Sequence, residues 1–132
     1  PDGSYVKNGW TEVGGRWYLF DASGRMLTGW QVRNGQMYYL DGSGAMITGW
    51  LSWNGRWCYM NETQDQYYGC LVCGHWLNRD GKTYYLDGVG YMAEGWYQVD
   101  GNWYYFYPGQ GNKAVNTTID TFYVNQQGIW VH

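Results

Sequence analysis

Residues 29–50 read GWQVRNGQMYYLDGSGAMITGW and hold one complete copy of a pattern that recurs along the chain. A Gly-Trp pair is followed by a two-residue turn sequence, a run of aromatic residues and a Gly-bearing connector. The Trp residues that open the five copies are Trp10, Trp30, Trp50, Trp76 and Trp96, spaced by 20, 20, 26 and 20 residues. A near-constant period predicts an array of small repeats, none of which can bury its apolar face alone.

Each copy carries a dipeptide that is typical of a tight β-turn. These dipeptides are Gly14-Gly15, Asn34-Gly35, Asn54-Gly55, Asp80-Gly81 and Asp100-Gly101. They tolerate the positive φ that both central residues of a type I′ hairpin need. Because an isolated hairpin is marginal in water, the hairpins must stack. We therefore expect an all-β solenoid of stacked β-hairpins, with repeats at 9–28, 29–48, 49–74, 75–94 and 95–118 and a terminal partial unit at 119–132.

The composition favours rings over aliphatic side chains. Of 132 residues, 21% are aromatic, with ten Trp and fifteen Tyr against three Phe. Aliphatic residues are sparse, so a core of Leu, Ile and Val is not expected to be the main source of stability. Trp and Tyr carry a polar tip on an apolar body, which suits shallow packing and surfaces that face a ligand.

Charge and hydropathy exclude several classes of partner. The net charge is −3 and no run of Lys or Arg occurs, which disfavours nucleic acid even though aromatic stacking platforms occur there. No apolar stretch of 18 residues is present, so we expect no membrane insertion. The opening Pro1-Asp2-Gly3-Ser4 resembles the interior of a longer chain, and we expect a mature fragment or a domain of a larger protein.

Hairpin geometry predicts a groove between successive repeats. With Gly14-Gly15 at the turn, Trp10 and Trp17 share one face because side chains alternate along a strand. Tyr38 in the next hairpin should face back toward them, and Met46 in the following connector should close the floor. The alternative is that these rings only pack between repeats. Trp is bulkier than a dry core requires, which favours the groove.

Converging rings with a Met and no obligatory acid suit a quaternary ammonium ion. Such a cation has no N–H to donate, and its methyl groups prefer apolar contact and ring quadrupoles. Each ring contributes roughly 0.5–2 kcal/mol, so one site should bind weakly, on the order of millimolar. Several sites on one array would engage a polymer that displays many copies of the cation.

The motifs Gly15–Asp21 (GRWYLFD) and Gly44–Trp50 (GAMITGW) resemble the choline-binding repeats of Gram-positive cell-wall proteins and their phages. The resemblance implies a left-handed solenoid that binds choline or phosphocholine of teichoic acids between consecutive repeats. It implies a secreted, wall-associated, non-catalytic module, and such modules commonly accompany wall hydrolases. Glucan-binding and clostridial toxin repeats are similar, so an α-glucan reader is an alternative. A spacer or adhesin stalk that binds nothing in its grooves is another.

Carried over to this chain, the family pattern implies three occupied grooves. The first comprises Trp10, Trp17, Tyr38 and Met46; the third, Trp50, Trp57, Tyr84 and Met92; the fifth, Trp96, Trp103, Phe122 and Trp130. The second groove should be weak because Met37 and Cys58 replace rings. The fourth should be weak because Thr83 replaces a Trp and no Met stands near Asn112. Phe122, Tyr123 and Trp130 could instead form a homodimer seam.

The longer repeat 49–74 contains Cys70-x-x-Cys73 followed by His75. No second Cys pair completes a zinc site, so we expect no metal, and instead a disulfide bond from Cys58 to Cys70 or Cys73.

We also expect no catalysis and no cofactor. Asp21, Asp41 and Asp87 occupy equivalent connector positions, which is typical of turn residues rather than of an acid/base pair. His75 and His132 have no candidate nucleophile at a meaningful spacing.

Overall fold

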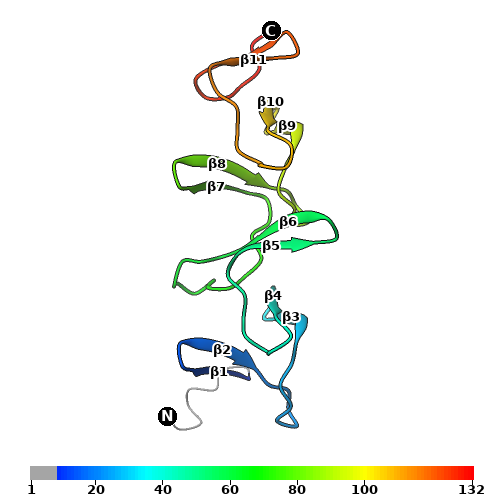
Figure 1. Ribbon diagram of the computed structural model, residues 1–132, viewed down its shortest axis with the longest axis vertical. Coiled ribbons are helices and arrows are strands. Elements are labelled where there is room, and N and C mark those ends of the chain that lie inside the picture. Colours follow the sequence, from blue (N-terminus) through cyan, green and yellow to red (C-terminus); the bar gives the residue numbers. More distant parts are fainter. Residues whose placement is uncertain (1–8) are drawn as a thin grey trace. The chain divides into compact units, whose positions relative to one another are not determined.

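The computed structural model describes residues 9–132, in which all regular structure is β (Figure 1). The twelve strands pair into two-stranded antiparallel sheets, one for each of six hairpins. The prediction of an all-β chain of hairpins is confirmed. Residues 9–132 contain no helix that is long and apolar enough to cross a membrane. Pro1–Ser4, which the sequence likens to the interior of a longer chain, lies outside the described residues.

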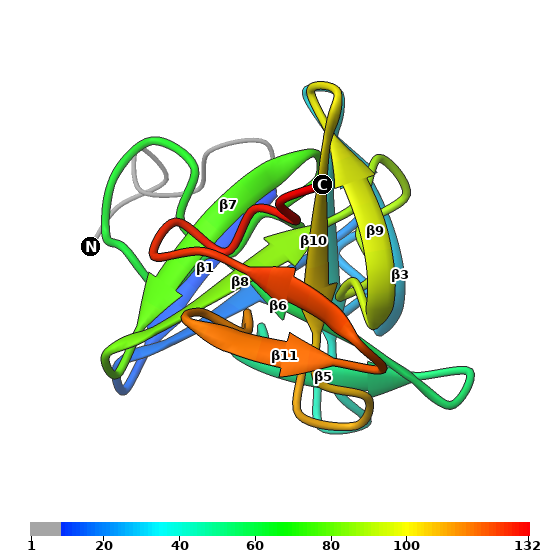
Figure 2. The same ribbon diagram turned by 90° about the horizontal axis from the view of Figure 1, so that it is seen from above.

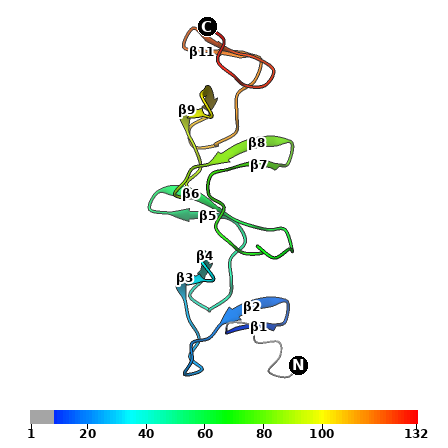
Figure 3. The same ribbon diagram turned by 180° about the vertical axis from the view of Figure 1, so that it is seen from behind.

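Residues up to Val72 form one compact part with three hairpins. Its hairpins are β1 (Trp10–Val13) with β2 (Arg16–Leu19), β3 (Gly29–Arg33) with β4 (Gln36–Leu40), and β5 (Gly49–Trp53) with β6 (Arg56–Met60). A wide inserted loop follows β6 and is visible in Figure 3. This loop contains the additional residues of the third repeat.

Residues from Cys73 onward form the second compact part, also with three hairpins. They are β7 (His75–Arg79) with β8 (Lys82–Leu86), β9 (Gly95–Val99) with β10 (Asn102–Phe106), and β11 (Thr117–Ile119) with β12 (Phe122–Val124). Within this part, Figure 2 shows β9 and β11 running in different directions, so successive hairpins are rotated. The last hairpin begins at Thr117, slightly before the expected start of the terminal unit.

The turns have the backbone that the sequence predicts. Asn34 and Gly35 have φ of 53° and 75°, and Asp100 and Gly101 have φ of 50° and 84°. Positive φ at both central residues is the type I′ requirement. The first hairpin places Trp10 opposite Leu19, and the turn therefore fixes which rings share a face.

The sixth hairpin uses a turn that the sequence analysis did not identify. Asp120 and Thr121 take φ of 50° and 74°. Thr is β-branched and pays a steric penalty in the left-handed region. This hairpin therefore closes at a backbone cost that the Gly-containing turns avoid.

Aspartates in the connectors act as turn residues, as predicted. The Asp41 Oδ1 accepts hydrogen bonds from the backbone N–H groups of Ser43 (2.9 Å) and Ala45 (3.1 Å). The same pattern recurs at Asp21, Asp87 and Asn125. Carboxylate and amide oxygens at this position both organise the connector, as in Asx-turns.

Several connectors are tied to two hairpins through their backbone. The N–H of Ile47 donates to the carbonyl of Tyr39 in its own hairpin (2.8 Å), and the N–H of Met46 donates to the carbonyl of Trp17 in the preceding one (2.9 Å). In the second part, Lys113 N–H donates to the Thr83 carbonyl in the same way (2.8 Å). These bonds place the residue at the Met46 position beside the preceding hairpin.

The most deeply buried part of the core takes one residue from each hairpin, the last of its second strand. These residues, each with 0% exposure, are Leu19, Leu40, Met60, Leu86, Phe106 and Val124. Burying such a side chain contributes about 1.5–3 kcal/mol. By contrast, Trp57 and Trp103 remain 40% and 38% exposed. The few aliphatic residues therefore carry more of the core than composition suggests, whereas no Trp among residues 9–132 is fully buried.

The prediction of a disulfide bond is wrong. Cys58, Cys70 and Cys73 form no disulfide bond within the described residues. The Cys70 thiol instead donates a hydrogen bond to the Tyr38 hydroxyl, 3.2 Å away. The sequence could not show this contact, because the two residues belong to different repeats.

Candidate functional site: aromatic grooves between hairpins

The fifth predicted groove is an aromatic cavity of about 210 Å³. Its walls are Trp96 from β9, Trp103 from β10, Phe122 from β12 and Trp130 from the last connector. No polar or charged side chain among residues 9–132 lines it. The structure thus brings together all four residues that the sequence assigned to this groove.

Phe122 stands at right angles to two of its neighbours in this cavity. Its ring centroid lies 6.0 Å from that of Trp96 with an interplanar angle of 88°, and 5.6 Å from that of Trp130 with an angle of 89°. The N–H of Trp130 donates to the Trp103 carbonyl (2.8 Å). The backbone therefore places Trp130 where Met46 lies in the first groove.

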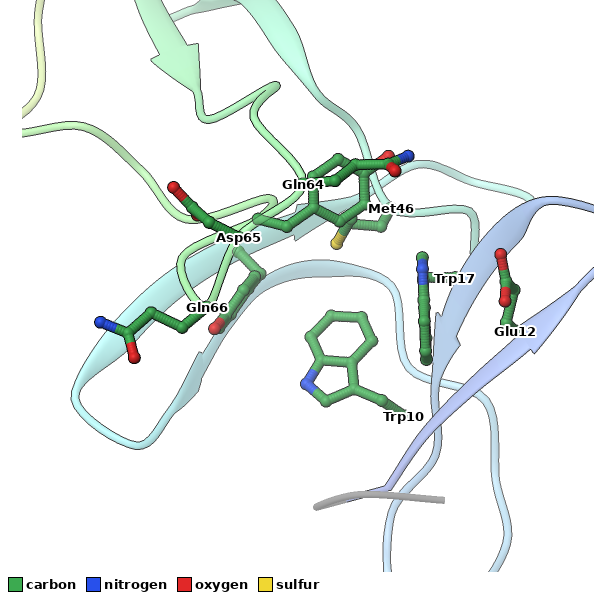
Figure 4. Close-up of a pocket in the computed structure, with 9 residues that line it drawn as sticks. Trp10, Glu12, Trp17, Met46, Gln64, Asp65 and Gln66 are labelled. Carbon is green, nitrogen blue, oxygen red and sulfur yellow. The ribbon is translucent and has the colours of Figure 1, made fainter. Parts of the chain in front are cut away.

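The first predicted groove is a larger cavity of about 490 Å³ (Figure 4). Trp10 and Trp17 from the first hairpin, Tyr38 from the second and Met46 from the connector all line it. The Trp10 and Tyr38 centroids lie 4.9 Å apart with an interplanar angle of 64°. The four residues that the sequence assigned to this groove therefore meet around one space.

Polar residues that the sequence analysis missed also line the first groove. They are Glu12 from β1 and Gln64, Asp65, Gln66 and Tyr68 from the inserted loop. Figure 4 shows Gln64, Asp65 and Gln66 across the cavity from Trp17 and Glu12. Two carboxylates beside the rings favour a cation. The six-residue excess of this repeat was the available signal, but it did not show where the loop would fold.

The inserted loop also supports one wall of this groove. Burial raises the pKa of the Tyr38 hydroxyl well above its ordinary value, because it disfavours the charged phenolate. Tyr38 therefore stays neutral further into the alkaline range than an exposed Tyr does. Cys70 is itself buried, and its hydrogen bond holds the Tyr38 hydroxyl in place.

The methionines of the connectors pack against a glycine in the next connector. A Cβ added at Gly69 would lie 2.7 Å from Met46 Cε, and one at Gly111 would lie 2.7 Å from Met92 Cε. Both glycines have positive φ, 83° and 80°. Only glycine leaves room for the Met side chain here and also adopts this backbone.

In the second repeat, Trp30 packs against other rings. Its centroid lies 5.5 Å from that of Trp53, at 86°, and 5.1 Å from that of Tyr39, at 64°. Cys58, which stands where the family has a Tyr, is 3% exposed. Trp53 was not assigned a role from the sequence, and it covers part of the Trp30 ring.

In the fourth groove, the ammonium group of Lys113 lies beside the aromatic rings. Trp76 and Tyr104 lie edge to face with centroids 4.9 Å apart, and Thr83 stands where a second Trp was expected. The Lys113 Nζ lies 5.3 Å from the Trp76 centroid and 5.7 Å from the Tyr104 centroid. The sequence predicted a weak groove here because no Met stands near Asn112, and it did not reveal the role of Lys113.

The third groove stays a prediction. It would combine Trp50 and Trp57 from the first compact part with Tyr84 and Met92 from the second. Within its own part, Trp50 packs edge to face on Tyr59, with centroids 5.1 Å apart. Met92 is buried, at 2% exposure.

Comparisons with known proteins identify relatives of the whole repeat array. The family model described as a choline-binding repeat matches residues 7–49 and 72–117. Choline binding protein F from Streptococcus pneumoniae is 43% identical, with 96% of this chain and 41% of that chain covered and a TM-score of 0.83. CbpJ from S. pneumoniae TIGR4 is 42% identical, with 95% and 41% covered and a TM-score of 0.83.

The modular autolysin LytC from S. pneumoniae is also similar, at 25% identity. The similarity covers 94% of this chain and 28% of LytC, with a TM-score of 0.72. The chain therefore spans well under half the length of these relatives. No curated protein matches it. Since the family model covers more than half of its residues, the chain belongs to the choline-binding repeat family.

Proposed function

We propose that this chain is a non-catalytic module that binds choline of cell-wall teichoic acids through the grooves between its hairpins. The module anchors a larger secreted protein to the surface of a Gram-positive cell. Family membership supports the choice of ligand, and the shape and composition of the grooves support the mode of binding.

The fifth groove is the single observation that carries the proposal. A cavity walled by Trp96, Trp103, Phe122 and Trp130, with only apolar atoms facing its interior, offers little to a sugar hydroxyl. It suits a trimethylammonium group, whose methyls contact ring faces and whose charge interacts with their quadrupoles. A glucan would leave its hydroxyl groups unpaired in such a site.

The first groove would take the same group in a more polar setting. Trp10, Trp17, Tyr38 and Met46 supply the apolar contacts, and Glu12 and Asp65 add negative charge. The family pattern adds Trp50, Trp57, Tyr84 and Met92 as a third groove, which stays a prediction from the sequence. Each groove alone binds weakly, and engagement of several choline groups on one polymer raises the apparent affinity.

The proposal extends to the protein from which the module comes. The chain covers 41% of choline binding protein F and 28% of the modular autolysin LytC. A repeat module of this kind attaches the protein to the cell wall. Any hydrolytic or adhesive activity would belong to other domains of the larger protein.

Calorimetric titration with choline tests the proposal, with Trp103→Ala and Trp17→Ala as groove variants. Each should remove one binding site and leave the others. Trp53→Ala is the matched control, because Trp53 packs on Trp30 and lines neither groove. It should lower stability and keep the wild-type stoichiometry.

Retention on a choline-bearing resin gives the second test. Free choline should elute the wild-type chain and an α-glucan should not. Elution by glucan alone would refute the proposal, and unchanged retention of the double variant Trp17→Ala/Trp103→Ala would assign the grooves to packing only.

A separate experiment tests the predicted homodimer. Phe122 and Trp130 would serve both the fifth groove and a dimer seam. The two uses compete for the same rings. Sedimentation with and without choline should show that choline leaves the chain monomeric.

A further inference from the structure

Lys113 stands at the connector position that carries Met46 in the first groove and Met92 in the predicted third groove. Its backbone forms an isolated bridge with Phe106, as Met46 does with Leu40 and Met92 does with Leu86. These bridges define one structural position in every repeat. The sequence obscures the equivalence, because the connectors differ in length and composition.

The side chain of Lys113 also follows the course of a connector Met. A Cβ added at Gly128, in the next connector, would lie 2.7 Å from Lys113 Cδ and 2.9 Å from Cε. Gly111 makes the same close approach to Met92. The aliphatic stem of Lys113 therefore fills the space of the Met, and its ammonium group extends further.

The ammonium group lies beside two rings. Its Nζ is 5.3 Å from the Trp76 centroid and 5.7 Å from the Tyr104 centroid, within the range of a cation–π interaction. It donates a hydrogen bond to the Gln127 carbonyl (2.8 Å). Burial lowers the pKa of Lys113, the direction expected for an ammonium group withdrawn from water.

The replacement of the second Trp by Thr83 fits this arrangement. Thr83 is shorter than Trp, and its hydroxyl donates to Asn78 Oδ1 (2.7 Å). The smaller residue leaves space on one side of the groove, and its polar group is satisfied without Lys113. Two changes from the family pattern thus occur together in one groove.

We propose that Lys113 is the built-in ligand of the fourth groove. Its ammonium group occupies the site between Trp76 and Tyr104 and closes this groove to external cations. It also links Trp76 of the fourth hairpin to Tyr104 of the fifth and to Gln127 in the last connector, independently of any ligand. The statement that Lys113 excludes choline from this groove rests on the proposed function above. The statement that Lys113 occupies the groove does not.

Proton NMR tests the occupancy without choline. Methylene protons above an aromatic ring are shifted upfield, so the ε-methylene of Lys113 should resonate upfield of that of the exposed Lys82. The ε-methylene signal that disappears in Lys113→Met is the signal of Lys113. Lys82→Met is the matched control and should remove the signal of Lys82 instead. A Lys113 signal at the position of Lys82 would overturn the proposal.

A gain of binding tests the closure of the groove. Thr83→Trp/Lys113→Met restores the family set of two Trp, a Tyr and a Met, and should bind one more choline per chain than the wild type. Lys82→Met should add none. Wild-type stoichiometry in the double variant, with a correctly folded circular dichroism spectrum, would overturn the closure.

Failure of the proposed function and failure of the inference about Lys113 would give different results. If Trp103→Ala removes no choline site from the wild type, the proposed function is wrong, and the upfield shift of Lys113 still decides the occupancy. If Trp103→Ala removes a site and the Lys113 signal is unshifted, only the inference about Lys113 is wrong.

Discussion

The Cys70 thiol donates a hydrogen bond to the Tyr38 hydroxyl across 3.2 Å and links the inserted loop to a wall of the first groove. The same loop contributes Gln64, Asp65 and Gln66 to the lining of that groove. Gly69, one residue before Cys70, provides the space for Met46. The insertion therefore shapes a groove formed by two earlier repeats.

Replacing Cys70 by Ala should weaken choline binding in the first groove. A neutral hydrogen bond is worth about 0.5–1.5 kcal/mol, so affinity should fall roughly 2- to 12-fold. Calorimetry in a Trp103→Ala background removes the contribution of the fifth groove. Cys70→Ser keeps a donor and should retain most of the affinity; equal losses in both variants would contradict a role for the hydrogen bond.

The raised pKa of Tyr38 predicts a loss of stability in alkali. Because burial favours the neutral phenol in the folded state, the folded pKa exceeds the ordinary value of 10.0. The stabilisation is complete below pH 10.0 and declines as the pH rises toward the folded pKa. Denaturant titrations across this range should show a steeper decline in the free energy of unfolding for wild type than for Tyr38→Phe. Parallel curves would contradict the shift.

Gly111→Ala should destabilise the chain more than Gly109→Ala. Both glycines lie in the same connector with φ of 80° and 81°, so both substitutions carry the same backbone cost. A Cβ at Gly111 meets Met92, whereas one at Gly109 meets nothing within 4 Å. Overpacking costs about 1–3 kcal/mol, and the difference between the two variants in denaturant titration measures it. Equal losses would mean that Met92 can move aside.

Thr121→Gly should stabilise the last hairpin. Thr121 has φ of 74°, where a non-Gly residue pays roughly 1–2 kcal/mol. Glycine removes this cost and loses part of the gain to the entropy of the unfolded chain. A net gain of a few tenths to about 1 kcal/mol should appear as a higher thermal midpoint. Thr118→Gly, within β11, is the control and should lower it.

Local features of the fold could be predicted from the sequence. The type I′ turns, the register of Trp10 opposite Leu19 and the role of Asp41 depend on residues only a few positions apart. Trp96, Trp103, Phe122 and Trp130 could be assigned to one groove because the repeat period carries the geometry of one hairpin to the next.

Contacts without a counterpart in the repeat could not be predicted in this way. The inserted loop could fold in any direction, so the hydrogen bond between Cys70 and Tyr38 and the approach of Asp65 to the first groove were invisible. Lys113 was overlooked because its equivalence to Met46 and Met92 depends on backbone bridges between strands and connectors.

The sequence by itself determined a series of β-hairpins with rings on defined faces, since turn chemistry and side-chain alternation act within one repeat. Only the tertiary structure decided how each groove is completed. Charges and side-chain volumes from distant segments meet there, and their positions depend on how the connectors pack against neighbouring hairpins.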